Sequence, residues 1–156
     1  MLSVGASRLT PRYMPPRGKV HLTSEPCFFH GLGVKSVKLR DIIGIVEGRV
    51  LTEGVNLDME ISCAAGADLM SDVLAFAKPD ALLLTGLVNP QVVRTAEMAD
   101  IAAIVFVRGK TPGPETISLA KEKGIPLIAA PYSMFELCGR LFEAGMASCD
   151  LEIKQE

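Results

Sequence analysis

Three short, unbroken apolar runs recur in the second half of the chain, and each is followed by a polar loop and a helix-like segment. The runs cover residues 81–84, 103–107 and 127–130, and their starts are 22 to 24 residues apart. Apolar and polar residues do not alternate within them, which is typical of strands covered on both faces of a parallel sheet. The pattern therefore predicts an α/β fold: a single domain with a mainly parallel sheet flanked by helices.

The segments between the runs carry local start and stop signals for helices. Asn89 followed by Pro90 is typical of a helix N-cap with proline at the first helical position. Gly124 is typical of a helix C-terminus. Ser133 and Glu136 fit a capping box, in which each side chain accepts a hydrogen bond from the other residue's backbone N–H. Helices are therefore predicted over residues 90–99, 114–123 and 133–144.

The first half of the domain is less regular. Its pattern predicts a short helix over residues 39–46, strands over 49–51 and 59–63, and a second helix over 71–77. The whole chain is therefore expected to hold about five strands and five helices, with no internal repeat of the solenoid kind.

Charge separates the first 36 residues from the rest of the chain. Residues 1–36 carry five basic side chains and one acidic one, a balance of +4, so the other 120 residues carry –6 of the overall –2. This segment is rich in proline and glycine, and is interpreted as a disordered basic extension or the product of a start codon assigned too far upstream. A basic arm or a transit peptide is the alternative. The domain is expected over residues 37–145, with a short C-terminal tail over 146–156.

The composition is that of an ordinary globular protein, with 49% apolar and 22% charged residues. No apolar run approaches the roughly 18 residues of a membrane span, and the N-terminus lacks the apolar core of a secretory signal. A cytoplasmic protein is predicted, with neither a membrane nor nucleic acid as a partner. The four cysteines lack C-x-x-C spacing, which favours reduced, mostly buried thiols over a disulfide framework. Cys27 and His30 alone offer too few ligands for a metal site.

The stretch IVFVRGKT, residues 104–111, follows a predicted strand with Gly-Lys-Thr, as a phosphate-binding loop does. That loop requires G-x-x-x-x-G-K-[ST], but Ile104 occupies the position of the first glycine. The loop must also run directly into a helix whose first N–H groups face the phosphates, whereas Thr111 is followed by Pro-Gly-Pro. The Gly-Lys-Thr is therefore interpreted as a coincidence, and an ATPase or kinase is not expected.

Side chains suited to catalysis are few. His21 and His30 both lie in the N-terminal extension, so the domain offers no histidine base for a nucleophile. Asp68 and Asp72 lie between a predicted strand and a predicted helix, and Asp72 fits a favourable charge in the first turn of that helix. No catalytic residue, metal site or cofactor is predicted, and the chain is not expected to be an enzyme.

A strand, Thr-Gly loop and helix at 81–99, and the stretch I-P-L-I-x-x-P-Y-S-M-F-E at 125–136, carry a resemblance to a known family. With them, the segment from about Val37 to Ala144 resembles the DRTGG-domain family, which is similar in fold to the N-terminal domain of HPr kinase/phosphorylase. The resemblance implies a stand-alone regulatory or ligand-sensing module that lacks the kinase relatives' separate phosphate-binding domain. The Asp-Arg-Thr-Gly-Gly signature is absent, because residues 85–90 read TGLVNP.

The predicted function is that of a non-enzymatic regulatory module that binds a small anionic metabolite or nucleotide and signals to a partner. In open α/β sheets, ligands bind at the carboxyl ends of the strands. Basic side chains there would attract an anion, and helix N-termini would add N–H donors. The alternatives are residues that only cap helices beside a solvated basic pair, and a protein-interaction or scaffold subunit without a small ligand. The candidate ligand-binding residues are Thr85, Gly86, Asn89, Arg108, Gly109, Lys110, Tyr132 and Ser133.

The predicted helix over 133–144 holds more apolar residues than one core-facing stripe can contain. Some of them must face another surface, unless the predicted helix near 37–46 covers both faces. Exposed apolar patches usually mark interfaces, most often two-fold ones, so a homodimer is predicted. The apolar residues in question are Met134, Phe135, Leu137, Cys138, Leu141 and Phe142.

Overall fold

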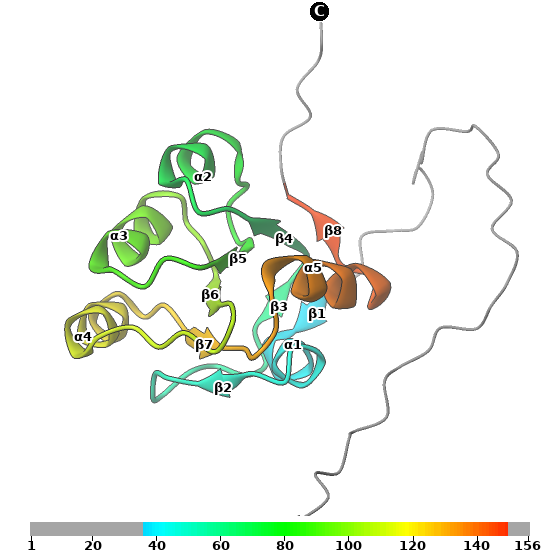
Figure 1. The fold of residues 1–156 in the computed structure, drawn as a ribbon, viewed down its shortest axis with the longest axis horizontal. Coiled ribbons are helices and arrows are strands. Elements are labelled where there is room, and N and C mark those ends of the chain that lie inside the picture. Colours follow the sequence, from blue (N-terminus) through cyan, green and yellow to red (C-terminus); the bar gives the residue numbers. More distant parts are fainter. Residues whose placement is uncertain (1–35, 150–156) are drawn as a thin grey trace, which may run out of the picture. The chain divides into compact units, whose positions relative to one another are not determined.

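The structure, a computed structural model, describes residues 36–149. Within this range the chain forms an α/β domain in which a six-stranded sheet has helices on both faces (Figure 1). The strands are β1 (Val37–Lys38), β2 (Arg49–Val50), β3 (Glu60–Ile61), β4 (Cys63–Gly66), β5 (Leu82–Thr85), β6 (Ala103–Phe106), β7 (Leu127–Ala129) and β8 (Ala147–Ser148). The helices are α1 (Leu39–Ile45), α2 (Met70–Phe76), α3 (Pro90–Met98), α4 (Pro114–Lys123) and α5 (Met134–Glu143).

The six-stranded sheet has the order β2-β7-β6-β5-β4-β8. Its four inner strands run parallel, with Leu83 opposite Ile104 and Val105 opposite Ile128. β8 is parallel to β4, whereas β2 is antiparallel to β7 at the other edge. The remaining strands, β1 and β3, form a separate antiparallel pair. The predicted fold class, with its mainly parallel sheet, is therefore confirmed.

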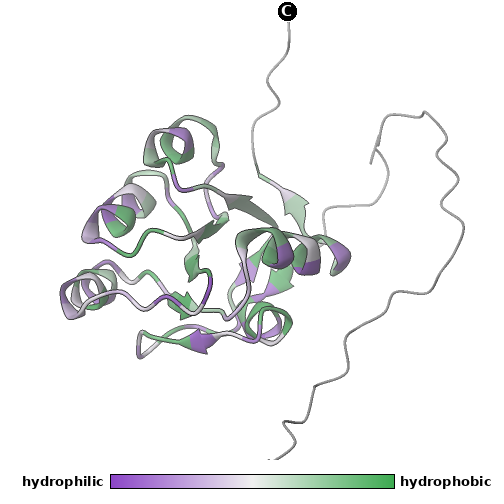
Figure 2. Cartoon of the chain, in the orientation of Figure 1, coloured by the Kyte–Doolittle hydropathy of each residue, from purple (hydrophilic) through white to green (hydrophobic). Residues whose placement is uncertain are grey.

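The inner strands are buried on both faces because helices cover each side. Leu83 and Ile104 belong to the apolar core shared with α2, α3 and α4. Leu82 and Val105 belong to the core shared with α1 and α5. Figure 1 shows the same division, and in Figure 2 the inner strands are coloured as hydrophobic, whereas the helices carry both hydrophobic and hydrophilic residues. The unbroken apolar runs thus have the physical cause expected from the sequence.

The helix termini agree with the sequence signals in part. Gly124 ends α4 in the left-handed conformation, with φ +67°. Ser133 Oγ accepts a hydrogen bond from the Glu136 backbone N–H at 3.4 Å. The other half of the capping box is wrong, since the Glu136 carboxylate binds Arg140 at 3.0 Å. Asn89 occupies the N-cap of α3 but makes no side-chain capping bond.

The single strand predicted over residues 59–63 is two strands, and this prediction is corrected. Ile61 pairs with β1, whereas Cys63 pairs with β8, so the chain leaves one sheet and enters the other at Ser62. Periodicity in one segment cannot show that its neighbouring residues pair with different partners. The main sheet also continues through β8, beyond the domain boundary predicted at residue 145.

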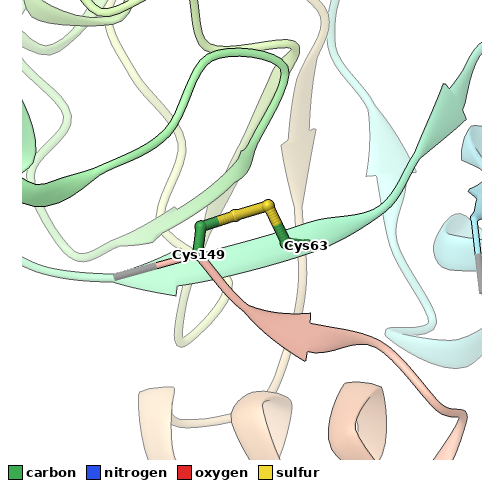
Figure 3. The surroundings of a disulfide bond; sticks show 2 residues. All are labelled: Cys63 and Cys149. Atoms are coloured by element: carbon green, nitrogen blue, oxygen red, sulfur yellow. A yellow bond between two sulfur atoms is a disulfide. The ribbon is translucent and has the colours of Figure 1, made fainter. Parts of the chain in front are cut away.

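The expectation that the cysteines are reduced thiols is wrong for two of them. Cys63 and Cys149 form a disulfide whose Cα atoms are 5.1 Å apart, although 86 residues separate them in the sequence (Figure 3). The parallel pairing of β4 with β8 brings the two residues together, and no local sequence pattern reports it. Cys138 is exposed on α5, and Cys27 lies outside the described residues.

A bilayer-spanning segment requires length and apolar character in one helix, and none of the helices described in residues 36–149 combines the two.

Candidate functional site

The carboxyl ends of the parallel strands meet at one edge of the sheet, where ligands bind in open α/β folds. Asp68 follows β4, Gly86 follows β5, and Lys110 follows β6. These three residues come from three separate loops, yet the structure brings them into contact. They form the centre of the candidate site. These three residues and Thr85 are called the carboxyl-edge cluster.

The Asp68 carboxylate organises the first half of this cluster. Its Oδ1 atom accepts hydrogen bonds from the Thr85 hydroxyl at 3.0 Å and from the Gly86 backbone N–H at 2.6 Å. The Thr85 hydroxyl oxygen in turn accepts from the Leu87 N–H at 3.2 Å. Thr85 is fully buried, so its partners are fixed by the fold. The sequence pattern identified Thr85 and Gly86 but assigned Asp68 no role in binding.

Lys110 supplies the second half of the cluster by reaching back across the sheet edge. Its ammonium group donates to the Gly86 carbonyl at 2.8 Å. A Cβ atom on Gly86 would lie 3.4 Å from both carboxylate oxygens of Asp68 and 3.4 Å from Lys110 Nζ. A carboxylate and an ammonium group therefore meet over one backbone position. Both side chains belong to exposed residues, so solvent reaches them.

The Gly-Lys-Thr loop does not hold its backbone in the manner of a phosphate-binding loop. Arg108 and Gly109 have φ values of +59° and +65°, and the Lys110 N–H closes the turn on the Val107 carbonyl at 3.2 Å. The N–H groups of Arg108 and Gly109 donate to carbonyls that follow β7, both at 2.7 Å. These three N–H groups are occupied within the fold, so they are not free to bind an anion as those of a phosphate-binding loop do.

A further basic residue approaches the same loop from the far edge of the sheet. The Arg49 guanidinium donates to the Thr111 hydroxyl at 3.5 Å. β2 runs antiparallel to β7 with Arg49 opposite Ala129, and this pairing carries the arginine to the carboxyl edge. Sequence reasoning missed Arg49 because its strand gives no sign of which neighbour it pairs with.

Tyr132 and Ser133 serve the α1–α5 side of the domain. The Arg140 guanidinium lies over the Tyr132 ring at 3.7 Å and binds Glu47 at 3.2 Å. A hydrogen bond to Glu47 raises the pKa of the Tyr132 hydroxyl and lowers the pKa of the Glu47 carboxyl. Ser133 caps α5. The side chains of these two predicted site residues therefore have partners in α5 and at Glu47, whereas the Tyr132 backbone carbonyl accepts a hydrogen bond from the Arg108 N–H at 2.7 Å.

Asn89 lies at the other side of the loop that begins with Thr85. The Thr116 hydroxyl of α4 donates to the Val88 carbonyl at 3.1 Å, which ties this loop to the neighbouring helix. Asn89 itself is exposed beside the N-terminus of α3. Among the described residues, no group of three or more His, Cys, Asp or Glu side chains has an arrangement suited to a metal ion. The pair Cys27 and His30 lies outside them.

Comparison with known proteins gives one family match and structural neighbours. The model of the DRTGG domain family matches residues 41–144. Among solved structures, the CBS and DRTGG domains of the regulatory region of Clostridium perfringens pyrophosphatase, complexed with the activator diadenosine tetraphosphate, match with a TM-score of 0.58 and 16% identity. The match covers 71% of this chain and 50% of that chain. The search of curated proteins gives no significant match.

Proposed function

Because the chain belongs to the DRTGG domain family, we propose that it is a regulatory module and not an enzyme. The ligand that it senses is a small anion of the nucleotide class. One observation carries the proposal: Asp68 and Lys110 converge on Gly86 at the carboxyl edge of the sheet. The cluster combines a cation with a hydrogen-bond acceptor, and it stands where ligands bind in this type of sheet.

Both charges have capacity left for a ligand. The two hydrogen bonds to Asp68 use the same oxygen, Oδ1, which leaves Oδ2 available to accept from a ligand hydroxyl or amino group. Lys110 makes one bond to a carbonyl and carries three donors in all. A nucleotide offers the complementary groups, a phosphate for the ammonium and ribose hydroxyls or base amino groups for the carboxylate.

Two further facts support a nucleotide as the ligand class. Arg49 and Arg108 lie in or beside the loop that carries Lys110, so the positive charge extends along the edge for a polyphosphate. The pyrophosphatase regulatory region with a similar fold binds diadenosine tetraphosphate.

No histidine occurs in the sequence from residue 36 to 149, which disfavours acid–base catalysis near neutral pH.

Thermal-shift titrations test the proposal with diadenosine tetraphosphate, ATP, AMP and inorganic phosphate. A ligand present at 100 times its Kd should add about 2.7 kcal/mol to the free energy of unfolding. Lys110→Ala should remove the shift for every phosphate compound. Asp68→Asn should weaken the binding of nucleotides more than the binding of inorganic phosphate, because it replaces one acceptor oxygen of the carboxylate by an amide donor.

Lys78→Ala is the matched control, because Lys78 is an exposed lysine that precedes β5 at the opposite, amino end of the strands. It should bind each compound like the wild type. The proposal fails if none of the four compounds shifts the melting temperature, or if Lys110→Ala and Lys78→Ala have equal effects. Absence of all ligand binding would favour the alternative role as a protein-interaction subunit.

A further inference from the structure

Helix α5 has an outward apolar face in addition to the face that packs on the sheet. Leu137 and Leu141 are buried against the sheet and α1. Phe135 and Phe142 remain 90% and 62% exposed. The alternative that α1 covers both faces is therefore wrong for these two aromatic side chains. They are seven residues apart, which is two helical turns, so they lie on one side of α5.

Gly139 lies between the two phenylalanines, and close packing within the domain does not require a glycine at this position. A Cβ atom at this position would have no neighbour within 4 Å. Glycine in a helix interior weakens the helix relative to alanine, so this residue is a cost within the monomer. A bare backbone on a helix surface does allow a second helix to approach more closely, because the interaxial distance depends on the side chains at the contact.

A pocket lies beside the same helix. It has a volume of about 250 Å³ and lies between α5 and the strands β4 and β8. Its walls include Gly66, Leu141, Phe142 and Met146, so most of its lining is apolar. The face of α5 that carries protruding aromatic rings is thus continuous with a hollow of matching character.

We propose that two copies of the chain associate through α5, with the helices antiparallel about a two-fold axis near Gly139. The midpoint between Phe135 and Phe142 falls between Cys138 and Gly139. An antiparallel pair centred there sets Phe135 of one copy against Phe142 of the other, at the rim of the pocket. A self-complementary patch of this kind is what a two-fold interface requires.

The exposed aromatic area supports a second copy as the occupant. A phenylalanine side chain buries about 150–250 Å², so four of them at these exposures supply on the order of 600 Å². That is about half of the 1,200 Å² at the lower limit of stable interfaces. The rims of the two pockets and the close approach at Gly139 would supply the rest.

The first test is the solution mass of the full chain over a concentration series, by light scattering or sedimentation. The wild type should approach twice 16.7 kDa, and Phe135→Glu should stay near 16.7 kDa. Phe135→Glu should leave the monomer folded because the side chain is exposed. Met98→Glu is the matched control: Met98 is 72% exposed on α3, which packs on the opposite face of the sheet. It should associate like the wild type.

The second test separates association from folding. Gly139→Gln should raise the melting temperature of the dilute monomer, because glutamine favours a helix more than glycine does. The same substitution should weaken association by about tenfold or more, because it overpacks the helix contact. A mass of 16.7 kDa for the wild type at every concentration would overturn the proposal. Equal effects of Phe135→Glu and Met98→Glu, or unchanged association of Gly139→Gln, would overturn it as well.

Discussion

The disulfide between Cys63 and Cys149 should make one of the largest single contributions to the stability of the domain. It closes a loop of 86 residues, and the chain-entropy model gives about 4.6 kcal/mol for a loop of that length. Native domains have total stabilities of about 5–15 kcal/mol, so this contribution is a substantial share. The bond also fixes β8, which has two residues and pairs with β4 alone.

Urea unfolding of the oxidised and reduced wild type measures this contribution directly. With a slope of about 2 kcal/mol per molar urea, reduction should lower the unfolding midpoint by about 2 M. The reduced wild type keeps both sulfur atoms, so the difference reports the cross-link and leaves the packing of Cys149 unchanged. A Cys63→Ala/Cys149→Ala double variant should be slightly less stable still, because both cysteines are buried.

Cys138→Ala is the control, because Cys138 takes no part in the disulfide. This variant should respond to reductant like the wild type, whereas the double alanine variant should not respond. Thiol titration in denaturant should find two thiols fewer before reduction than after it. Equal thiol counts, or a midpoint unmoved by reductant, would refute the reasoning.

Three shorter predictions concern other parts of the domain. Purified protein should not hydrolyse ATP, and turnover that Lys110→Ala abolishes would show that the Gly-Lys-Thr loop is catalytic after all. The hydrogen bond from Tyr132 lowers the pKa of Glu47 below its ordinary 4.5. The ionised Glu47 carboxylate therefore stabilises the folded state fully above pH 4.5, and this contribution is lost as the pH falls through the lowered pKa. On acidification from about pH 6 to about pH 3, the urea unfolding midpoint of Glu47→Gln should therefore fall by less than that of the wild type. Gly124→Ala should lower the free energy of unfolding, measured in urea, by about 1 kcal/mol because the residue has a φ of +67°. Gly44→Ala, in α1, should instead raise the free energy of unfolding.

The features that the sequence predicts well are those with a local physical cause. The runs at 81–84, 103–107 and 127–130 are apolar throughout because helices cover both faces of each strand. Gly124 ends a helix because few other residues adopt the left-handed conformation without strain. The parallel order of these strands then follows from the intervening helices, since a parallel connection needs a crossover of that length.

The features that the sequence misses depend on pairing between distant segments. β8 is only two residues long, and nothing near residue 147 indicates that it will pair with β4. The disulfide follows from that same pairing. Arg49 reaches the carboxyl edge only because β2 turns antiparallel to β7. Asp68 joins the candidate site through a bond to the Gly86 N–H, 18 residues away, which no spacing rule reports.

Strand β4 connects the disulfide with the two regions on which the proposals rest, the α5 face and the carboxyl-edge cluster. Cys63 begins the strand and holds the disulfide, and Gly66 ends it against α5, where a Cβ would meet Met134 Sδ at 3.0 Å. Asp68 follows two residues later and binds Gly86. A shift of β4 caused by association at α5 would therefore displace the Asp68 carboxylate. By linkage, any effect of self-association on ligand affinity must be matched by an equal effect of ligand on self-association. Ligand titrations of the wild type and Phe135→Glu would measure that coupling, and equal affinities would show that β4 holds Asp68 in place whatever contacts α5.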